Sequence, residues 1–128
     1  MVAQRSWNLL VVAHDERELD SFRSVFPELD VGGRFYGAST AAEAMEHIAS
    51  LRAHPAALAV LADHRLGRGA LTGVDVLREA RMRRPDSLRL LMGDEPPGDV
   101  EQAMLAGDVH AFLEKPNVVR PLADLLRR

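Results

Sequence analysis

Two aspartates and one lysine of this sequence each follow a short apolar run. Carboxylate oxygens are suited to a hard cation such as Mg²⁺, and an aspartate can also act as a covalent nucleophile toward phosphorus. A lysine ammonium can neutralise the negative charge of a phosphoryl group during its transfer. The residues concerned are Asp15, Asp63 and Lys115, with His14 beside the first aspartate and Gly93–Asp94 after a further apolar run.

The segments around these residues alternate between two patterns. Short, continuous apolar runs are typical of buried strands. Between them lie segments with apolar residues at helical spacing, one of which opens with the capping-box pattern Thr40–Glu43 and another of which we expect to end at Pro27. We expect strands over 7–13, 33–38, 58–62, 88–92 and 109–113, and helices over 16–26, 40–54, 73–84, 99–106 and 117–128.

This alternation indicates an α/β domain with a five-stranded parallel sheet that is covered by helices on both faces. We expect one domain over residues 1–128, because the 128-residue chain contains no linker and no internal repeat. In an open parallel sheet, ligands bind beyond the carboxyl ends of the strands, at the switch in strand order. The two carboxylates and the ammonium would therefore converge at one edge of the sheet.

Composition excludes several classes of function. The formal net charge is -3 and no basic stripe runs along the chain, so we expect no direct nucleic-acid binding by this domain. The absence of cysteine excludes disulfides, thiol catalysis and cysteine-ligated metals. No apolar run is long enough to span a membrane, so we expect a soluble domain in the cytoplasm without membrane contact.

The single lysine of the chain is a compositional signal of its own. Fifteen of the 16 basic residues are arginine, and the only lysine is Lys115, directly before Pro116. The ammonium of a lysine is compact and sits on a flexible stem, so the two cations are not interchangeable. The use of lysine at this one position favours a functional role for it.

Over nearly its whole length the sequence resembles the receiver domains of bacterial two-component systems. The resemblance rests on LLVVAHDERELD, on LAVLADHRL with TGVDVL, on RRPDSLRLLMG and on AGDVHAFLEKP, of which FLEKP is the most specific. It implies the doubly wound, flavodoxin-like (βα)5 fold and a signalling module rather than an enzyme. Asp63 would accept a phosphoryl group from a sensor histidine kinase, and Lys115, in a Lys-Pro peptide with Pro116, would sense that group.

The same resemblance implies a metal site and a conformational switch. Asp15, Asp63 and the backbone carbonyl of Arg65 would bind Mg²⁺, and Phe112 would be the aromatic switch residue. The face formed by residues 99–128 would contact an effector domain or a downstream protein, or would form a homodimer.

Two positions depart from the family pattern. His14 stands beside Asp15 where receivers have an acid, and an imidazole is a poorer ligand for Mg²⁺ than for Zn²⁺ or other transition metals. Gly93, the second switch position, stands where the family has a hydroxyl that meets the phosphoryl group. Two functions therefore stay open: a receiver that is phosphorylated on Asp63, and a pseudo-receiver that acts as a phosphorylation-independent interaction or dimerisation module.

Three further alternatives use the same edge of the sheet. His14, Asp15, Asp63 and His64 could together bind Zn²⁺ or Mn²⁺. A small hydrolase could use Asp63 as its nucleophile, although the second acid that such enzymes need is missing from the following HRLG. A flavin binder would fit the fold, but AHDERE stands where its phosphate loop would be.

Overall fold

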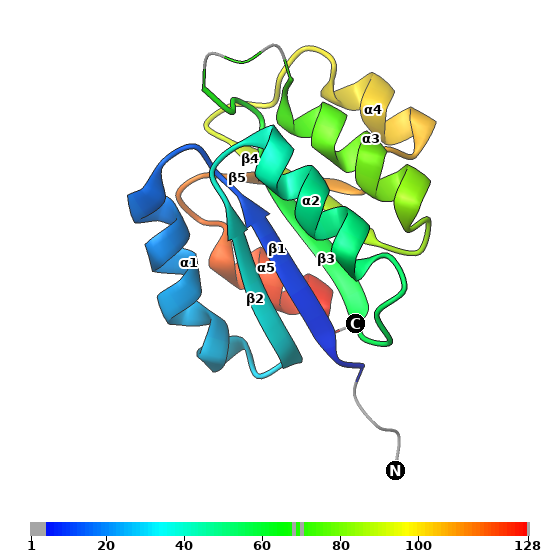
Figure 1. The fold of residues 1–128 in the computed structure, drawn as a ribbon. Coiled ribbons are helices and arrows are strands. Elements are labelled where there is room, and N and C mark those ends of the chain that lie inside the picture. The colour runs from blue at the N-terminus through cyan, green and yellow to red at the C-terminus, as the bar shows by residue number, and fades with distance from the viewer. Residues whose placement is uncertain (1–4, 68, 70, 128) are drawn as a thin grey trace.

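The structure is a computed structural model that describes residues 5–67, 69 and 71–127. Within this range five strands and five helices alternate along the chain, as the sequence predicts (Figure 1). The strands are β1 (Trp7–Val12), β2 (Gly32–Ala38), β3 (Ala57–Asp63), β4 (Leu88–Gly93) and β5 (Ala111–Glu114), and the helices are α1 (Glu16–Leu29), α2 (Ala41–Leu51), α3 (Gly73–Arg83), α4 (Val100–Ala106) and α5 (Val119–Leu126).

All strand pairs are parallel, and the strand order is β2-β1-β3-β4-β5. This is the flavodoxin-like, doubly wound order, and it confirms the predicted fold class. The order reverses at β1, which pairs with β2 on one side and with β3 on the other, so the switch point lies beyond the carboxyl ends of β1 and β3. In the described part of the chain, no helix is long and apolar enough to cross a membrane.

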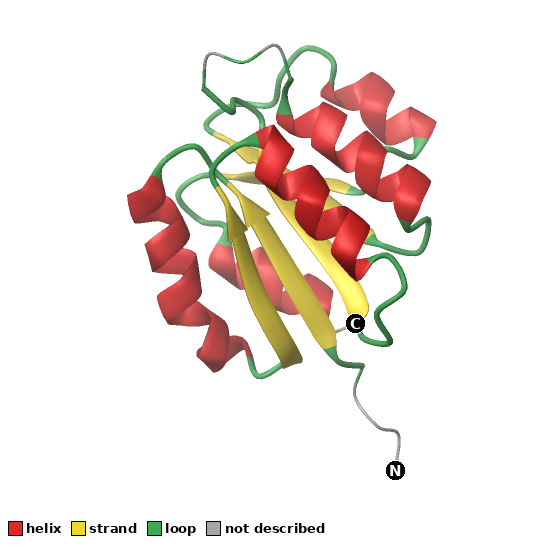
Figure 2. Ribbon diagram, viewed as in Figure 1, coloured by secondary structure: helices red, strands yellow, loops and turns green. Residues whose placement is uncertain are grey.

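Helices cover both faces of the sheet. Helices α1 and α5 lie on one face, and α2, α3 and α4 lie on the other (Figure 2). The inner strand β1 contributes side chains to the hydrophobic core on both faces of the sheet. Leu9 and Val11 belong to the cluster under α1 and α5, and Leu10 and Val12 belong to the cluster on the opposite face. All four side chains are fully buried, and burial of each stabilises the fold by about 1.5–3 kcal/mol.

Helix α1 is longer than the sequence predicts. We expected Pro27 to end it, but the helix includes Pro27 and continues to Leu29. A proline in the last turn removes one hydrogen bond, to the carbonyl of Arg23, and water can replace it there because Arg23 is exposed. Asp30 then ends the helix in a left-handed conformation, with its backbone N–H donating to the carbonyl of Pro27 at 3.3 Å.

Two buried arginines close the amino-terminal end of the sheet. Arg89 donates hydrogen bonds to the backbone carbonyls of Ser87, Gly107 and Asp108 at 2.8–3.2 Å. Arg84 donates to the carbonyl of Leu51 at the end of α2, at 3.0 Å, and to the carbonyl of Ala56 before β3, at 2.7 Å. Because both guanidinium groups are hydrogen-bonded to backbone carbonyls, we interpret their role at this end of the sheet as structural.

The carboxyl-terminal end of β3 packs tightly against the start of α3. A Cβ atom placed on Gly73 would lie 2.2 Å from the carbonyl oxygen of Asp63 and 3.0 Å from the side chain of Leu91. The backbone N–H of Gly73 also donates to the carbonyl of His64 at 3.0 Å. The absence of a side chain at Gly73 thus allows α3 to support the residues at the end of β3.

We predict that Gly73→Ala destabilises the protein, although the same exchange in an open helix is favourable. The added Cβ would force apart β3 and α3, and we expect a loss of about 1–3 kcal/mol in the free energy of unfolding. Urea denaturation measures this loss. Gly98→Ala is the matched control, because a Cβ there meets no atom within 4 Å. A Gly73→Ala protein as stable as the control would contradict the prediction.

Candidate functional site

The chemistry-bearing residues lie at the carboxyl-terminal edge of the sheet. Asp63 is the last residue of β3 and stands opposite Met92 of β4. Lys115 directly follows β5, and its backbone N–H donates to the carbonyl of Gly93 at 2.8 Å. The peptide between Lys115 and Pro116 is cis. The fold therefore brings Asp63 and Lys115 to one point, as the positions of the strand ends suggest.

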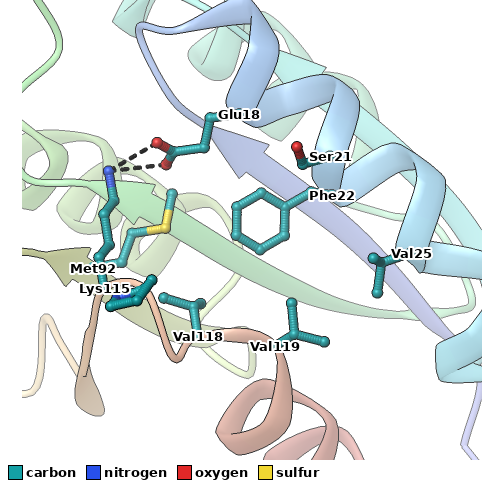
Figure 3. Close-up of a pocket in the computed structure, with 9 residues that line it drawn as sticks. Glu18, Ser21, Phe22, Val25, Met92, Lys115, Val118 and Val119 are labelled. Carbon is teal, nitrogen blue, oxygen red and sulfur yellow. Dashed lines mark hydrogen bonds and ion pairs between the residues drawn. The ribbon is translucent and has the colours of Figure 1, made fainter.

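Lys115 forms ion pairs with two carboxylates. Its Nζ lies 2.7 Å from Oδ2 of Asp63, 2.9 Å from Oε1 of Glu18 and 3.0 Å from Oε2 of Glu18. The side chains of Lys115, Asp63 and Glu18 are 22%, 17% and 25% exposed. We call these three side chains the charge triad. Figure 3 shows the ammonium facing the carboxylate of Glu18.

The environment of the charge triad changes the pKa of Lys115. Burial by itself lowers this pKa, because it disfavours the charged ammonium. Hydrogen bonds and charge attraction from Asp63 and Glu18 outweigh burial, so the pKa of Lys115 lies above its ordinary value of 10.5. The ammonium is thus fully charged at neutral pH.

Glu18 was not among the residues that the sequence analysis selected. It lies in the first turn of α1, where an acidic residue is already explained by the helix dipole. A signal was nevertheless present, because Glu18, Phe22 and Val25 are spaced as neighbours on one helical stripe. All three line a cavity of about 260 Å³ between α1 and the start of α5, with Val118 and Val119 opposite (Figure 3).

The predicted metal ligands Asp15 and His14 make local contacts of their own. Asp15 is exposed and caps α1, with its Oδ1 accepting the backbone N–H of Arg17 at 2.8 Å. His14 is exposed, and its ring lies against Gly67, where a Cβ atom would be 3.0 Å from the imidazole. One carboxylate oxygen of Asp15 is therefore engaged in the cap of α1.

Arg65, by contrast, lies beside Asp63. Both residues line an open hollow of about 690 Å³ between the loops after β3 and β4. Asp94 and Glu95, in the loop after β4, line the same hollow. Over residues 5–67, 69 and 71–127 no three His, Asp or Glu side chains are grouped so that they could hold a metal ion. Of the predicted ligands, Asp63 alone brings a carboxylate to this hollow, and Lys115 pairs with it. The Mg²⁺ ligand set of Asp15, Asp63 and the backbone carbonyl of Arg65, which contains only two carboxylates, stays a prediction.

The alternative Zn²⁺ or Mn²⁺ site is not assembled in the described residues. His64 lines the same hollow as Asp63, but its Nε2 lies 3.9 Å from Oδ1 of Asp99, an exposed residue before α4. The structure therefore does not gather the four residues around one point.

The two predicted switch positions are in contact range of each other. A Cβ atom placed on Gly93 would lie 3.5 Å from the ring of Phe112, which is an ordinary contact distance. Phe112 is partly buried and packs against the core cluster under α3 and α4. Gly93 is buried and has no side chain, so the end of β4 offers backbone alone to the site.

We predict that Lys115→Met removes a pH-dependent part of the stability. Because the pKa of Lys115 is raised in the folded protein, its ammonium stabilises the fold below pH 10.5, and this stabilisation is lost as the pH rises through the raised pKa. The wild type should be more stable than the variant by about 1–2 kcal/mol at about pH 8, and this gap should shrink at about pH 11.5.

Urea denaturation at both pH values measures the gap. Other groups that titrate at alkaline pH are common to both proteins and cancel in the comparison. Arg120→Met, an exchange of an exposed arginine on α5, is the control and should show no pH-dependent gap. A gap for Lys115→Met that is equal at both pH values would contradict the prediction.

Comparisons with known proteins agree with this architecture. No protein-family model matches the chain, and no curated protein matches it significantly. Among solved structures, a CheY-like receiver domain protein from Methanospirillum hungatei matches 97% of this chain and 91% of its own, with a TM-score of 0.75 and 22% identity. A receiver domain protein from Clostridium thermocellum matches 93% of this chain and 90% of its own, with a TM-score of 0.74 and 21% identity.

The chemotaxis protein CheY4 from Vibrio cholerae matches 98% of each chain, with a TM-score of 0.68 and 20% identity. Each of these matches covers at least 93% of this chain. At sequence identities of 20–22%, these matches show the fold alone. The fold of this chain is that of the response-regulator receiver domains.

Proposed function

We propose that this chain is a two-component receiver domain that accepts a phosphoryl group on Asp63 from a sensor histidine kinase in the bacterial cytoplasm. The observation that carries the proposal is the ion pair between Nζ of Lys115 and Oδ2 of Asp63, 2.7 Å apart at the carboxyl-terminal edge of the sheet. The fold supports the proposal independently, because it places this pair beside the topological switch point.

The proposed step is a transfer between two side chains. An oxygen of Asp63 forms a bond to phosphorus while the bond between phosphorus and the imidazole nitrogen of the kinase breaks. The electron pair of the broken bond stays on that nitrogen, which then takes up a proton. Lys115 faces the developing negative charge on the phosphoryl oxygens, and such charge neutralisation is a main source of catalysis in phosphoryl transfer.

The Asp63 residue forms an ion pair and also lines the hollow after β3 and β4. Oδ2 pairs with Lys115. The side chain also lines the hollow with Arg65 and Glu95, through which a phosphodonor would approach. A Mg²⁺ ion, if bound with the donor, would supply further charge neutralisation at this hollow. The proposed oxygen ligands are the carboxylates of Asp15 and Asp63, the backbone carbonyl of Arg65 and the donor itself.

The output surface proposed here is the face formed by α4, β5 and α5, residues 99–128. Helix α4 exposes apolar side chains there: Leu105 is 88% exposed and Met104 is 42% exposed. Val119 at the start of α5 is 37% exposed. Exposed apolar side chains of this kind favour contact with an effector domain, a downstream protein or a second copy of the chain. One structurally similar protein, the receiver domain of NtrC4, forms a dimer in its beryllofluoride-activated state.

A phosphorylation-independent pseudo-receiver is the second candidate. It is favoured by two features of the site: His14 stands where receivers have an acid, and Gly93 brings no hydroxyl to it. In that case the ion pairs of Lys115 would hold the fold in one state, and the face over residues 99–128 would bind its partner constitutively.

We predict that the wild-type protein gains a single phosphate adduct when it is incubated with acetyl phosphate or carbamoyl phosphate and Mg²⁺. Asp63→Ala should abolish the adduct, because it removes the nucleophile. Intact-mass analysis detects both results. Asp94→Ala is the matched control, because Asp94 lines the same hollow but does not contact Lys115 among the described ion pairs, and it should retain the adduct.

The opposite result would favour the second candidate. If the wild type stays unmodified at high donor concentration, also with Mn²⁺ in place of Mg²⁺, then Asp63 is not a phospho-acceptor. Circular dichroism of the Asp63→Ala protein shows whether the loss of an ion-pair partner has unfolded it.

A further inference from the structure

Glu18 has no part in the proposed function, and yet it contacts Lys115 almost as closely as Asp63 does. The distances from Nζ of Lys115 are 2.9 Å to Glu18 and 2.7 Å to Asp63. Glu18 and Lys115 come from segments 97 residues apart in the sequence, so this contact is made by the tertiary fold.

The surroundings of Glu18 hold its carboxylate against Lys115. The cavity beside it is walled mainly by apolar side chains, among them Phe22, Val25 and Val119 (Figure 3). Its one hydroxyl, on Ser21, donates to the backbone carbonyl of Arg17 at 3.0 Å. Oε2 accepts a hydrogen bond from Lys115, whereas Oε1 is buried without a hydrogen-bond partner of its own and relies on the charge of the ammonium 2.9 Å away. A partly buried carboxylate without that ammonium would be unpaired, which is costly.

The charge triad already has an excess of negative charge. Two carboxylates face one ammonium, and Asp94 and Glu95 line the adjoining hollow. A phosphoryl group on Asp63 would add more negative charge at the same ammonium. Lys115 could pair with the phosphoryl oxygens fully only if it loosened its contact with Glu18.

We propose that Glu18 is a built-in competitor for Lys115 that restrains phosphoryl transfer to Asp63. The inference rests on the proposed function and adds a regulatory residue to it. Glu18 occupies the place of the second anion at Lys115 while Asp63 is unmodified, and the incoming phosphoryl group has to displace it. Phosphorylation is therefore coupled to the release of a carboxylate on α1.

Glu18→Gln tests this inference, because glutamine keeps the shape of the side chain and removes its charge. We expect the initial rate of adduct formation on Asp63 with acetyl phosphate to rise about three- to tenfold. Glu18→Met is a second variant without the charge, and it matches the apolar wall of the cavity should glutamine be poorly tolerated. Glu16→Gln changes the net charge equally at an exposed position in the same helical turn, and it should leave the rate within about twofold of the wild type.

A second measurement uses the single lysine of the chain as a probe. Lysine labelled with ¹³C and ¹⁵N gives one side-chain signal in an NMR spectrum, because Lys115 is the only lysine. The pKa of Lys115 should be lower in Glu18→Gln than in the wild type and in Glu16→Gln, since one of its two anionic partners has lost its charge. A merely structural role of Glu18 would not raise the phosphorylation rate.

The outcomes separate the inference from the proposed function. A faster Glu18→Gln protein supports both, including the case in which only this variant is phosphorylated. If the wild type is phosphorylated and Glu18→Gln is equally fast or slower, the inference is wrong and the proposed function stands. If neither protein nor Glu18→Met gains an adduct on Asp63, both are wrong.

Discussion

Both faces of the sheet are covered by helices, and the central strands β1, β3 and β4 are therefore apolar along nearly their whole length. An ionisable side chain within such a strand would leave water without a partner, at a large cost in free energy. Polar chemistry is confined to the ends of the strands. At the carboxyl-terminal end, the packing of both helical layers holds Asp63 and Lys115 together, although 52 residues separate them in the sequence.

The two ends of the sheet use different cations for different tasks. At the amino-terminal end, Arg84 and Arg89 are buried, and their planar guanidinium groups satisfy several backbone carbonyls each. At the carboxyl-terminal end stands Lys115, whose compact ammonium contacts two carboxylates without fixing the direction of either. The planar guanidinium group of arginine is suited to backbone carbonyls whose positions are fixed by the fold. An ammonium on a flexible stem can instead exchange one anion for another.

Sequence patterns locate the elements well, because burial on both faces leaves a continuous apolar run in each central strand. They fail at Pro27, since whether water can replace a lost hydrogen bond depends on exposure. The pair Asp63–Lys115 follows from strand ends that share one edge. Which acidic residue of the first helix contacts Lys115 does not follow from the sequence. Asp15 is nearer to the end of β1, but its carboxylate caps α1. Glu18, three residues later on the helix, is the residue that contacts Lys115. Such a choice depends on side-chain directions that spacing alone leaves open.

The balance of charge at Lys115 matters more for function than the fold does. An ammonium between two carboxylates is satisfied without a phosphoryl group, so the same backbone can serve a receiver and a pseudo-receiver equally well. If Glu18 competes for Lys115 as proposed, one quantity that separates the two functions is the free energy of exchanging the carboxylate of Glu18 for a phosphoryl oxygen at Lys115. That quantity depends on how well water or a protein donor can solvate Glu18 once it is released. Because the cavity beside Glu18 has apolar walls, its release is costly in the free domain, and a partner that contacts α1 could lower this cost.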